Sequence, residues 1–511
     1  MRILGAGLIA GVALATVAQA QEPLNKPLSV IDWLDTQSDT TAALPLPSEP
    51  GVTTSGSVPE VSVGPLDGAA PQRIGLAPPS VTGLPDTVWS SSSGRALAHA
   101  IETMPTLHLP ALQSLFYTLL LAEAAPPATD ADIFDMARVD ALMDLGALDP
   151  ALALIEQTAP AISKAHFARY FDMALLAGTD ATACAILRDR PRLSPSKAHD
   201  VFCTARAGDW DTAVLLLGTG RVLGLIPDAT AAALERFLDP DLFEDEPALA
   251  PPTEPDPLVF RLFQAIGTPI PTRGLPLVYA NADLADTAGW KAQIEAAERL
   301  ARTGALPDNR LLGLYTFRQP AASGGVWDRV QALQRFETAL ETGSSTAVSL
   351  TLPTVWSAMI EARLAVPFAT LFSEQLNTMV LSGRTADIAF EVLLLSPLYE
   401  TAARTFPSRA VQRPVLAAVA GGAVPMSLTA DGIEGAILAG FRDAPPDQRI
   451  IETAQSGALG TALFDTVQMM DAGGKGDVAR LTTGLATLRA LGLEDVARRA
   501  ALQVLLLGPQ S

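Results

Sequence analysis

The chain has 511 residues, 49% of them hydrophobic, and a formal net charge of -20. This length and apolar content are sufficient for a sizeable core. So acidic a chain is repelled by phosphate backbones and by anionic membrane surfaces, which argues against nucleic acid as a partner. We interpret the charge as a means of keeping an apolar, alanine-rich protein in solution.

The first 20 residues have the features of a Sec-type signal peptide. Arg2 supplies a positive charge, residues 3–17 form a short apolar run, and Ala18-Gln19-Ala20 is a cleavage site that would leave Gln21 as the mature N-terminus. The apolar run is shorter than the roughly 20 residues that span a bilayer. No later segment is long and apolar enough to do so. We therefore expect an exported, periplasmic protein with no integral membrane span after cleavage.

The chain contains two cysteines, Cys184 and Cys203. In an oxidising compartment an even number favours a disulfide over a reactive thiol. Residues 180–187 and 197–207 have helical patterns, and two prolines within residues 190–195 indicate a turn between them. Two antiparallel helices joined in this way bring the cysteines opposite each other. We predict a structural disulfide that staples a helical hairpin; the alternative is a pair of buried, reduced core cysteines.

Residues 21–92 are rich in Pro, Ser, Thr, Gly and Val, and acids outnumber bases there. Such a stretch buries too little apolar surface to offset chain entropy, so we predict a disordered tail. Two apolar islands interrupt it. In the first, Val30, Ile31, Trp33 and Leu34 form an apolar helical turn that we expect to dock on a partner or a distal site rather than on its own domain. The second, residues 81–89, is expected to fold back onto its own domain.

From residue 93 onward the apolar spacing is helical throughout, which predicts an all-α protein. One stripe at helical spacing consists of Trp290, Ile294, Ala297, Leu300 and Ala301. Charged residues such as Glu298 and Arg302 take the other faces of that helix, at the favourable i,i+4 spacing. Alternating strand patterns are scarce, and residues 275–280, bounded by proline and glycine, are expected to form a loop.

Helical hairpins recur with a common turn. Gly146, Gly178 and Gly208 recur every 30 to 32 residues, each followed by an Asp or Thr and then by alanine. The glycine is expected to end one helix in a left-handed C-cap, and the Asp or Thr to cap the next helix. This Gly-x-x-x-x-Ala turn resembles degenerate tetratricopeptide or Sel1-like repeats. The resemblance implies an α-solenoid of stacked helical hairpins that binds proteins or peptides on a concave face.

Clustered prolines and acids in residues 239–257 indicate a break between two helical regions. The domain organisation predicted is therefore a signal peptide (1–20), a tail (21–92), an N-terminal helical-repeat domain (93–240), an acidic, proline-rich linker (241–257) and a C-terminal helical domain (258–511). The acidic residues 239–246 lack the ordered spacing of a calcium loop, so a solvated loop is preferred to a cation site.

The sequence contains no pattern that predicts a catalytic, metal or cofactor site. None of the four histidines belongs to a zinc-hydrolase or deaminase motif, and no G-x-S-x-G nucleophile turn occurs. The most distinctive stretch contains Tyr315, Trp327 and Arg329, where a glycine-rich loop enters a helix. One hypothesis is a ligand pocket with helix N-terminal amides for an anion. We favour the other, in which Ser323 caps the helix, Trp327 packs in the core, and Asp328 and Arg329 lie on the surface.

These features favour a periplasmic protein-binding or scaffolding factor that holds protein partners of the cell envelope. A cell-wall-associated accessory factor, or an enzyme whose site has no recognised motif, is the alternative.

Overall fold

The computed structural model describes residues 72–508, which belong to one compact unit. The predicted signal peptide, most of the predicted tail and the motif at Val30, Ile31, Trp33 and Leu34 lie outside the described residues. Within residues 72–508 the structure is all-α, with isolated β-bridges but no strand. No helix in this range is long and apolar enough to cross a membrane.

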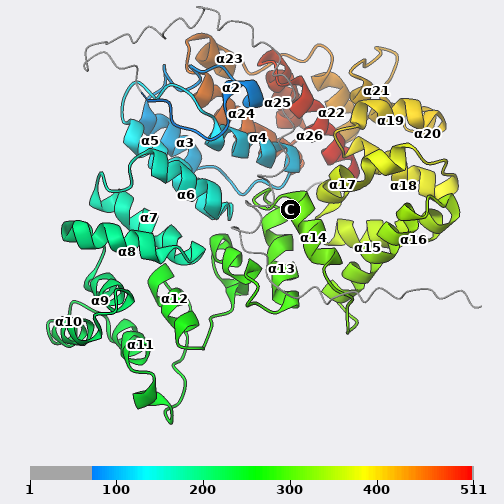
Figure 1. The fold of residues 1–511 in the computed structure, drawn as a ribbon. Coiled ribbons are helices and arrows are strands. Elements are labelled where there is room, and N and C mark those ends of the chain that lie inside the picture. Colours follow the sequence, from blue (N-terminus) through cyan, green and yellow to red (C-terminus); the bar gives the residue numbers. More distant parts are fainter. Residues whose placement is uncertain (1–71, 509–511) are drawn as a thin grey trace, which may run out of the picture. The chain divides into compact units, whose positions relative to one another are not determined.

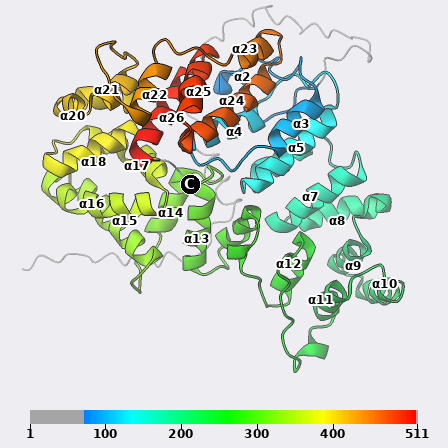
Figure 2. The ribbon, with the colours of Figure 1, turned by 180° about the vertical axis from the view of Figure 1, so that it is seen from behind.

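Successive helices pack as neighbours along most of the described chain, so the predicted fold of stacked helical hairpins is confirmed (Figures 1 and 2). The elements of the first half are α2 (Pro79–Thr82), α3 (Gly94–Glu102), α4 (Pro110–Leu121), α5 (Ala131–Asp144), α6 (Leu148–Gln157), α7 (Lys164–Ala177), α8 (Asp180–Asp189), η2 (Pro191–Leu193), α9 (Lys197–Arg206), α10 (Trp210–Val222), α11 (Asp228–Leu238), η3 (Asp241–Phe243) and α12 (Pro257–Ala265). Those of the second half are η4 (Thr272–Gly274), η5 (Leu277–Leu284), α13 (Trp290–Ala301), α14 (Asp308–Thr316), α15 (Val326–Glu341), α16 (Ser345–Glu361), α17 (Ala365–Asn377), α18 (Gly383–Leu394), α19 (Tyr399–Thr405), α20 (Pro407–Gln412), α21 (Pro414–Gly421), α22 (Gly432–Gly440), α23 (Gln448–Gln455), α24 (Leu459–Gly474), α25 (Val478–Ala490) and α26 (Glu494–Leu507).

The glycines take the left-handed conformation predicted for them, but the predicted side-chain cap forms in one of the three turns. Gly146, Gly178 and Gly208 have φ angles of 80°, 74° and 87°, in the left-handed region that residues with a side chain rarely adopt. There is also no room for a side chain at Gly146, because a Cβ there would lie 2.5 Å from a methyl group of Leu300. In the third turn Asp209 caps α10 by accepting a hydrogen bond from the Thr212 amide. In the first turn the N-cap residue of α6 is Ala147, and in the second Thr179 stands at the N-cap of α8 without a side-chain cap bond. Local sequence thus explains where these helices end better than how the next ones begin.

A tetrapeptide that occurs twice in the chain marks two equivalent helix starts. Ser-Lys-Ala-His occurs at residues 163–166 and again at 196–199, immediately before and within the first turns of α7 and α9. The hydroxyl of Ser163 lies 2.8 Å from Nδ1 of His166, and that of Ser196 lies 2.9 Å from Nδ1 of His199. The same local structure therefore recurs at the same place in successive hairpins, as expected for a helical repeat.

The beginning of the described chain packs on its end. Helices α3 and α4 contact α24, and α4 also contacts α26, so the blue and red segments lie side by side in both views (Figures 1 and 2). Trp89 is buried between Phe134 and Phe464, with ring centroids 5.0 and 5.9 Å away. The Gly460 amide donates to the Val88 carbonyl at 3.0 Å. This contact joins segments that are far apart in the sequence.

The predicted tail boundary at residue 92 is therefore wrong for residues 74–92. Their backbone pairs with residues 121–125. Their few apolar side chains, Trp89 above all, pack on α24 near the other end of the chain. As expected, residues 81–89 fold back onto the domain: Val88 and Trp89 are buried, although Val81 stays exposed.

The acidic, proline-rich segment of residues 241–257 contains only the short helix η3 before α12 begins. Helix α12 then packs on α7 and α11, and the compact unit runs across the segment. The loop expected at residues 275–280 is instead partly helical, since η5 starts at Leu277. Contacts of η5 with α5, α7 and α13 stabilise this 3-10 helix, and a local pattern cannot reveal such contacts.

Candidate functional site

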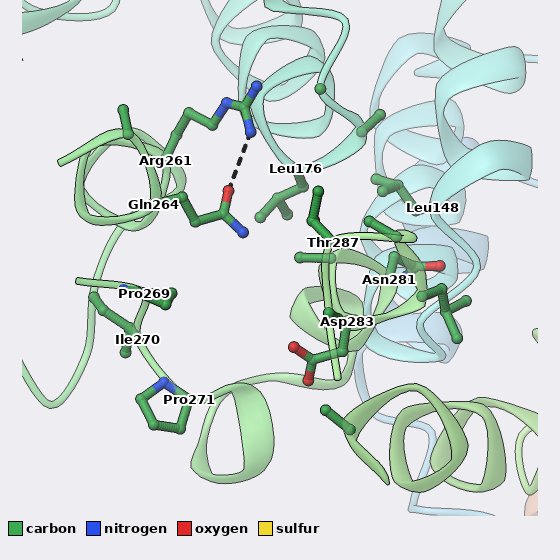
Figure 3. A pocket seen from close by; sticks show the side chains of 18 of the residues that line it. Leu148, Leu176, Arg261, Gln264, Pro269, Ile270, Pro271, Asn281, Asp283 and Thr287 are labelled. Carbon is green, nitrogen blue, oxygen red and sulfur yellow. Dashed lines mark hydrogen bonds between the residues drawn. The ribbon is translucent and has the colours of Figure 1, made fainter. Parts of the chain in front are cut away.

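A cleft of about 880 Å³ lies among the described residues. One side is formed by the repeat helices α6, α7, α9, α11 and α12, and the other by η5, the loop after it, and the first turns of α13 and α14. Figure 3 shows Arg261 and Gln264 on one side of this cleft, with Asn281 and Asp283 across from them. Its size and mixed lining are those of a binding site for a small molecule or a short chain segment.

Two arginines on the repeat side share one buried carboxylate. Asp180, the first residue of α8, is fully buried, and its Oδ2 accepts a hydrogen bond from Nε of Arg206 at 2.9 Å. Its other oxygen, Oδ1, lies 3.7 Å from Nη2 of Arg261 and has no hydrogen-bond partner among the described residues. Both guanidinium groups remain partly exposed at the cleft wall. One carboxylate thus fixes two cations and leaves an excess positive charge facing the cleft.

Charges on the other side are more balanced. Asp283 accepts a hydrogen bond from the Thr272 hydroxyl and lies 3.8 Å from Arg299, so its charge is largely compensated. Arg310, at the start of α14, is exposed and forms no ion pair with any residue that the structure describes. Asp149 is the exposed acid of the cleft rim. The cleft therefore presents the guanidinium groups of Arg206, Arg261 and Arg310 beside one exposed carboxylate, that of Asp149.

Apolar side chains line the floor between these charges. Leu148 and Leu176 come from α6 and α7, and Phe202 and Phe237 stack with ring centroids 5.6 Å apart. Pro269, Ile270 and Pro271 form the edge after α12 (Figure 3). An apolar floor with fixed guanidinium groups beside it suits a ligand that combines an apolar side chain with a carboxylate.

The predicted disulfide is present and braces this wall. Cys184 in α8 and Cys203 in α9 are bonded, with their Cα atoms 5.2 Å apart. The same two helices carry Asp180 and Arg206, each about one turn from the bridge. The disulfide therefore fixes the two helices whose ion pair shapes the cleft.

The stretch around Tyr315, Trp327 and Arg329 forms a buried ion cluster and no pocket of useful size. Tyr315 is buried, and its hydroxyl donates to Oε1 of Glu298 at 2.6 Å. Arg329 binds both oxygens of Glu298, at 2.7 and 2.8 Å. Trp327 is half-buried and packs against Trp290, with ring centroids 4.9 Å apart. These residues connect α13, α14 and α15.

Two details of the favoured interpretation of this stretch are wrong. Ser323 does not cap α15: the N-cap residue is Gly325, and the exposed Asp328 carboxylate accepts from the Gly324 amide at 2.9 Å. Arg329 points inward rather than lying on the surface, because the buried Glu298 attracts it. Spacing alone placed Glu298 on a solvent face with Arg302; only the approach of α14 and α15 makes that face internal.

Two of the acidic residues in 239–246 have structural partners. Asp239 accepts a hydrogen bond from the Leu242 amide at 3.3 Å, and Glu246 pairs with Arg236 at 3.2 Å. Among the residues that the structure describes, no group of three or more His, Cys, Asp or Glu side chains converges as metal ligands would.

Two titratable groups of the repeat helices, the partly buried Asp172 of α7 and the buried His199 of α9, have shifted pKa values. Burial raises the pKa of Asp172 to about 7, against the opposing effect of Arg169, whose Nη1 lies 3.7 Å away. Burial lowers the pKa of His199 to about 4. Its Nε2 has no hydrogen-bond partner among the described residues, and its ring stands edge-on to Phe171 at 4.9 Å. The fold therefore favours protonated Asp172 and neutral His199.

These pKa shifts predict that the two groups change the free energy of unfolding with pH in opposite directions. Folded Asp172 holds its proton up to about pH 7, whereas an unfolded aspartate loses it near pH 3.9, so Asp172 makes stability fall as pH rises through that window. His199 is neutral in the folded chain above about pH 4 but in the unfolded chain only above 6.5, so it makes stability rise with pH. In the wild-type chain the two slopes oppose each other.

We expect Asp172→Asn to add a positive slope to the unfolding free energy across about pH 4 to 7, and His199→Asn a negative one, each at most about 1.4 kcal/mol per pH unit. Urea unfolding at several pH values, relative to wild type, measures both. Asp286→Asn, at an exposed position, is the control and should follow wild type. Parallel profiles for all four proteins would contradict the assignment.

The residues of the cleft were missed in the sequence. Asp180 sits in a Gly-Thr-Asp-Ala turn, where an aspartate usually serves as a cap, and Arg206 and Arg261 belong to no motif. The sequence signal that existed was indirect: the disulfide hairpin contains both Asp180 and Arg206. Comparison of this chain with protein-family models, with curated proteins and with solved structures finds no match.

Proposed function

We propose that this protein is a periplasmic binding or scaffolding factor, and that its cleft holds an acidic segment of a partner protein of the cell envelope. The observation that carries the proposal is the arginine pair Arg206 and Arg261 on the buried Asp180, set in a cleft of about 880 Å³. In a chain of net charge -20, these exposed guanidinium groups can bind carboxylates that the rest of the surface repels.

The compartment is supported by two independent features. The predicted signal peptide ends in Ala18-Gln19-Ala20. The Cys184–Cys203 bond requires oxidising conditions, which cytosolic proteins rarely meet.

A protein partner is supported by the architecture. Stacked hairpins with recurring Gly turns and the repeated Ser-Lys-Ala-His helix start resemble tetratricopeptide or Sel1-like repeats, whose grooves typically receive extended protein segments. The cleft offers fixed guanidinium groups for carboxylates, the exposed Arg310 as a further cation, and an apolar lining that includes the edges of the largely buried Leu148 and Leu176. A segment with acidic and aliphatic side chains satisfies all three.

Site-specific photocrosslinking tests the proposal in the periplasm. A photoreactive side chain at Ala265, which is exposed in the cleft, should capture a discrete partner, whereas the same group at the exposed Met426 should not. Arg206→Gln with Arg310→Gln should weaken binding of the captured partner about 10- to 100-fold, because two charge-assisted contacts are lost.

Arg384→Gln is the control and should bind as wild type. Like Arg310, Arg384 is an exposed arginine that forms no ion pair among the described residues. Melting temperatures confirm that each variant is folded. Equal capture at Ala265 and Met426, or full binding by the double variant, would contradict the proposal. Deletion of residues 21–71, which leaves the described unit whole, asks separately whether the motif at Val30, Ile31, Trp33 and Leu34 contributes to capture.

A further inference from the structure

Helix α10 and the turn after it expose an unusual concentration of large apolar side chains. Of the sixteen large hydrophobic residues that are exposed among residues 72–508, six lie within α10 and the turn after it. They are Trp210, Val214, Leu215, Val222, Leu223 and Leu225. Monomeric proteins rarely expose so concentrated an apolar patch, and such patches usually mark interaction surfaces.

One side of α10 combines two protruding apolar side chains with an open glycine, and this side is the α10 face. Leu215, Gly218 and Val222 follow i, i+3, i+7 spacing, so they lie on one side of the helix, opposite the buried Ala213, Leu217 and Gly220. Leu215 and Val222 are 71% and 86% exposed. Nothing lies within 4 Å of the position that a Cβ of Gly218 would take. A protruding leucine thus stands one turn from an open glycine.

We propose that this face pairs with the same face of a second copy of the chain, with the two α10 helices antiparallel about a two-fold axis. In that arrangement Leu215 of each copy enters the notch at Gly218 of the other, and the same contact forms twice. A two-fold interface requires such self-complementarity.

The charges of α10 favour the antiparallel arrangement. Its first turn carries Asp211 and its last turn carries Arg221, and both are exposed. Parallel pairing sets the two Asp211 carboxylates together, whereas antiparallel pairing separates them and sets the two helix dipoles in opposite directions. Arg221 already forms an ion pair with Glu235 of α11, so it adds little attraction of its own.

Helix α10 rests on helices that a disulfide holds together. Helix α10 packs closely on α9, which the Cys184–Cys203 bond joins to α8, and α10 lies at the outer edge of the repeat helices in both views (Figures 1 and 2). The face includes none of the cleft residues, so pairing and cleft binding are separable. One helix and its following turn supply less than the roughly 800 Å² per partner of a standard interface, so the dimer should be weak, roughly micromolar.

Sedimentation velocity of the mature protein from about 1 to 100 µM tests the proposal, since this range brackets the affinity expected. The wild-type chain should shift from monomer to dimer with rising concentration. Leu215→Glu should remain a monomer at every concentration with an unchanged melting temperature, because the side chain is exposed. Leu350→Glu, at an exposed leucine of α16, is the matched control and should dimerise as wild type.

Cysteine pairing tests the register. The described chain has no free cysteine, so introduced thiols are the reactive ones. Copies with Leu215→Cys mixed with copies with Gly218→Cys should form a disulfide-linked dimer, whereas Leu350→Cys copies should not. A wild-type chain that stays monomeric throughout, a Leu215→Glu chain that still dimerises, or mixed cysteine copies that do not crosslink would overturn the proposal.

Discussion

Trp89→Ala is expected to lower the free energy of unfolding by about 3–5 kcal/mol, the usual cost of removing a large buried aromatic. Trp89 is 1% exposed and lies between Phe134 of α5 and Phe464 of α24. Its loss therefore opens a cavity at the contact between the two ends of the described chain. Urea unfolding followed by circular dichroism measures the change.

Val81→Ala is the matched control, because Val81 belongs to the same N-terminal segment but is 75% exposed; its effect should stay within about 0.5 kcal/mol. Gly460 provides a second, independent readout. A Cβ at Gly460 would lie 2.4 Å from the Trp89 ring, so Gly460→Ala should destabilise the wild-type chain.

In the Trp89→Ala background, Gly460→Ala should cost much less, because the new methyl group enters the vacated space. A double-mutant cycle with a coupling energy near zero would show that the Trp89–Gly460 contact does not form. Similar unfolding curves for Trp89→Ala and Val81→Ala would show the same.

Glu298→Ala is the second substitution with a large expected effect, a loss of about 3–5 kcal/mol. Glu298 is buried, and removing its carboxylate leaves the partly buried guanidinium of Arg329 without its partner and the Tyr315 hydroxyl without its acceptor. Since these three residues come from α13, α14 and α15, the packing of all three helices is weakened. Thermal and urea unfolding measure the loss.

Glu298→Gln should have an intermediate effect, because the amide still accepts a hydrogen bond but no longer balances the charge of Arg329. Glu295→Ala is the matched control on the same helix: Glu295 is only partly buried and pairs with Lys291 at 3.7 Å, so less than about 0.5 kcal/mol should be lost. Equal effects of Glu298→Ala and Glu295→Ala would mean that Arg329 and Tyr315 have other partners.

The local features of this fold were predictable because neighbouring residues decide them. Helical spacing predicted the apolar stripe of α13, where Ile294, Ala297 and Leu300 are buried. A glycine with positive φ ends a helix whatever lies around it, so Gly178 and Gly208 act as expected. The Cys184–Cys203 bond followed from two helices and one short turn, all within a single hairpin.

Contacts between distant segments were not predictable in this way. Residues 74–92 have the composition of a tail, and Trp89 is buried only because α24 presents Phe464 and the bare backbone of Gly460 to it. Likewise, the spacing of apolar residues predicts that Glu298 faces solvent. Its side chain is buried only because α15 packs against α13 and brings Arg329 to it.

The amino-acid sequence by itself determined the helices, the turns that end them and the disulfide that joins one pair, because each depends on residues within one hairpin. Only the tertiary structure decided which hairpins meet. It brought Arg261 of α12 to the carboxylate of Asp180 and set η5 across from them, which creates the cleft. The reason is physical: a helix shows one apolar face to many possible neighbours, and the choice among them rests on packing and charge compensation summed over the whole chain.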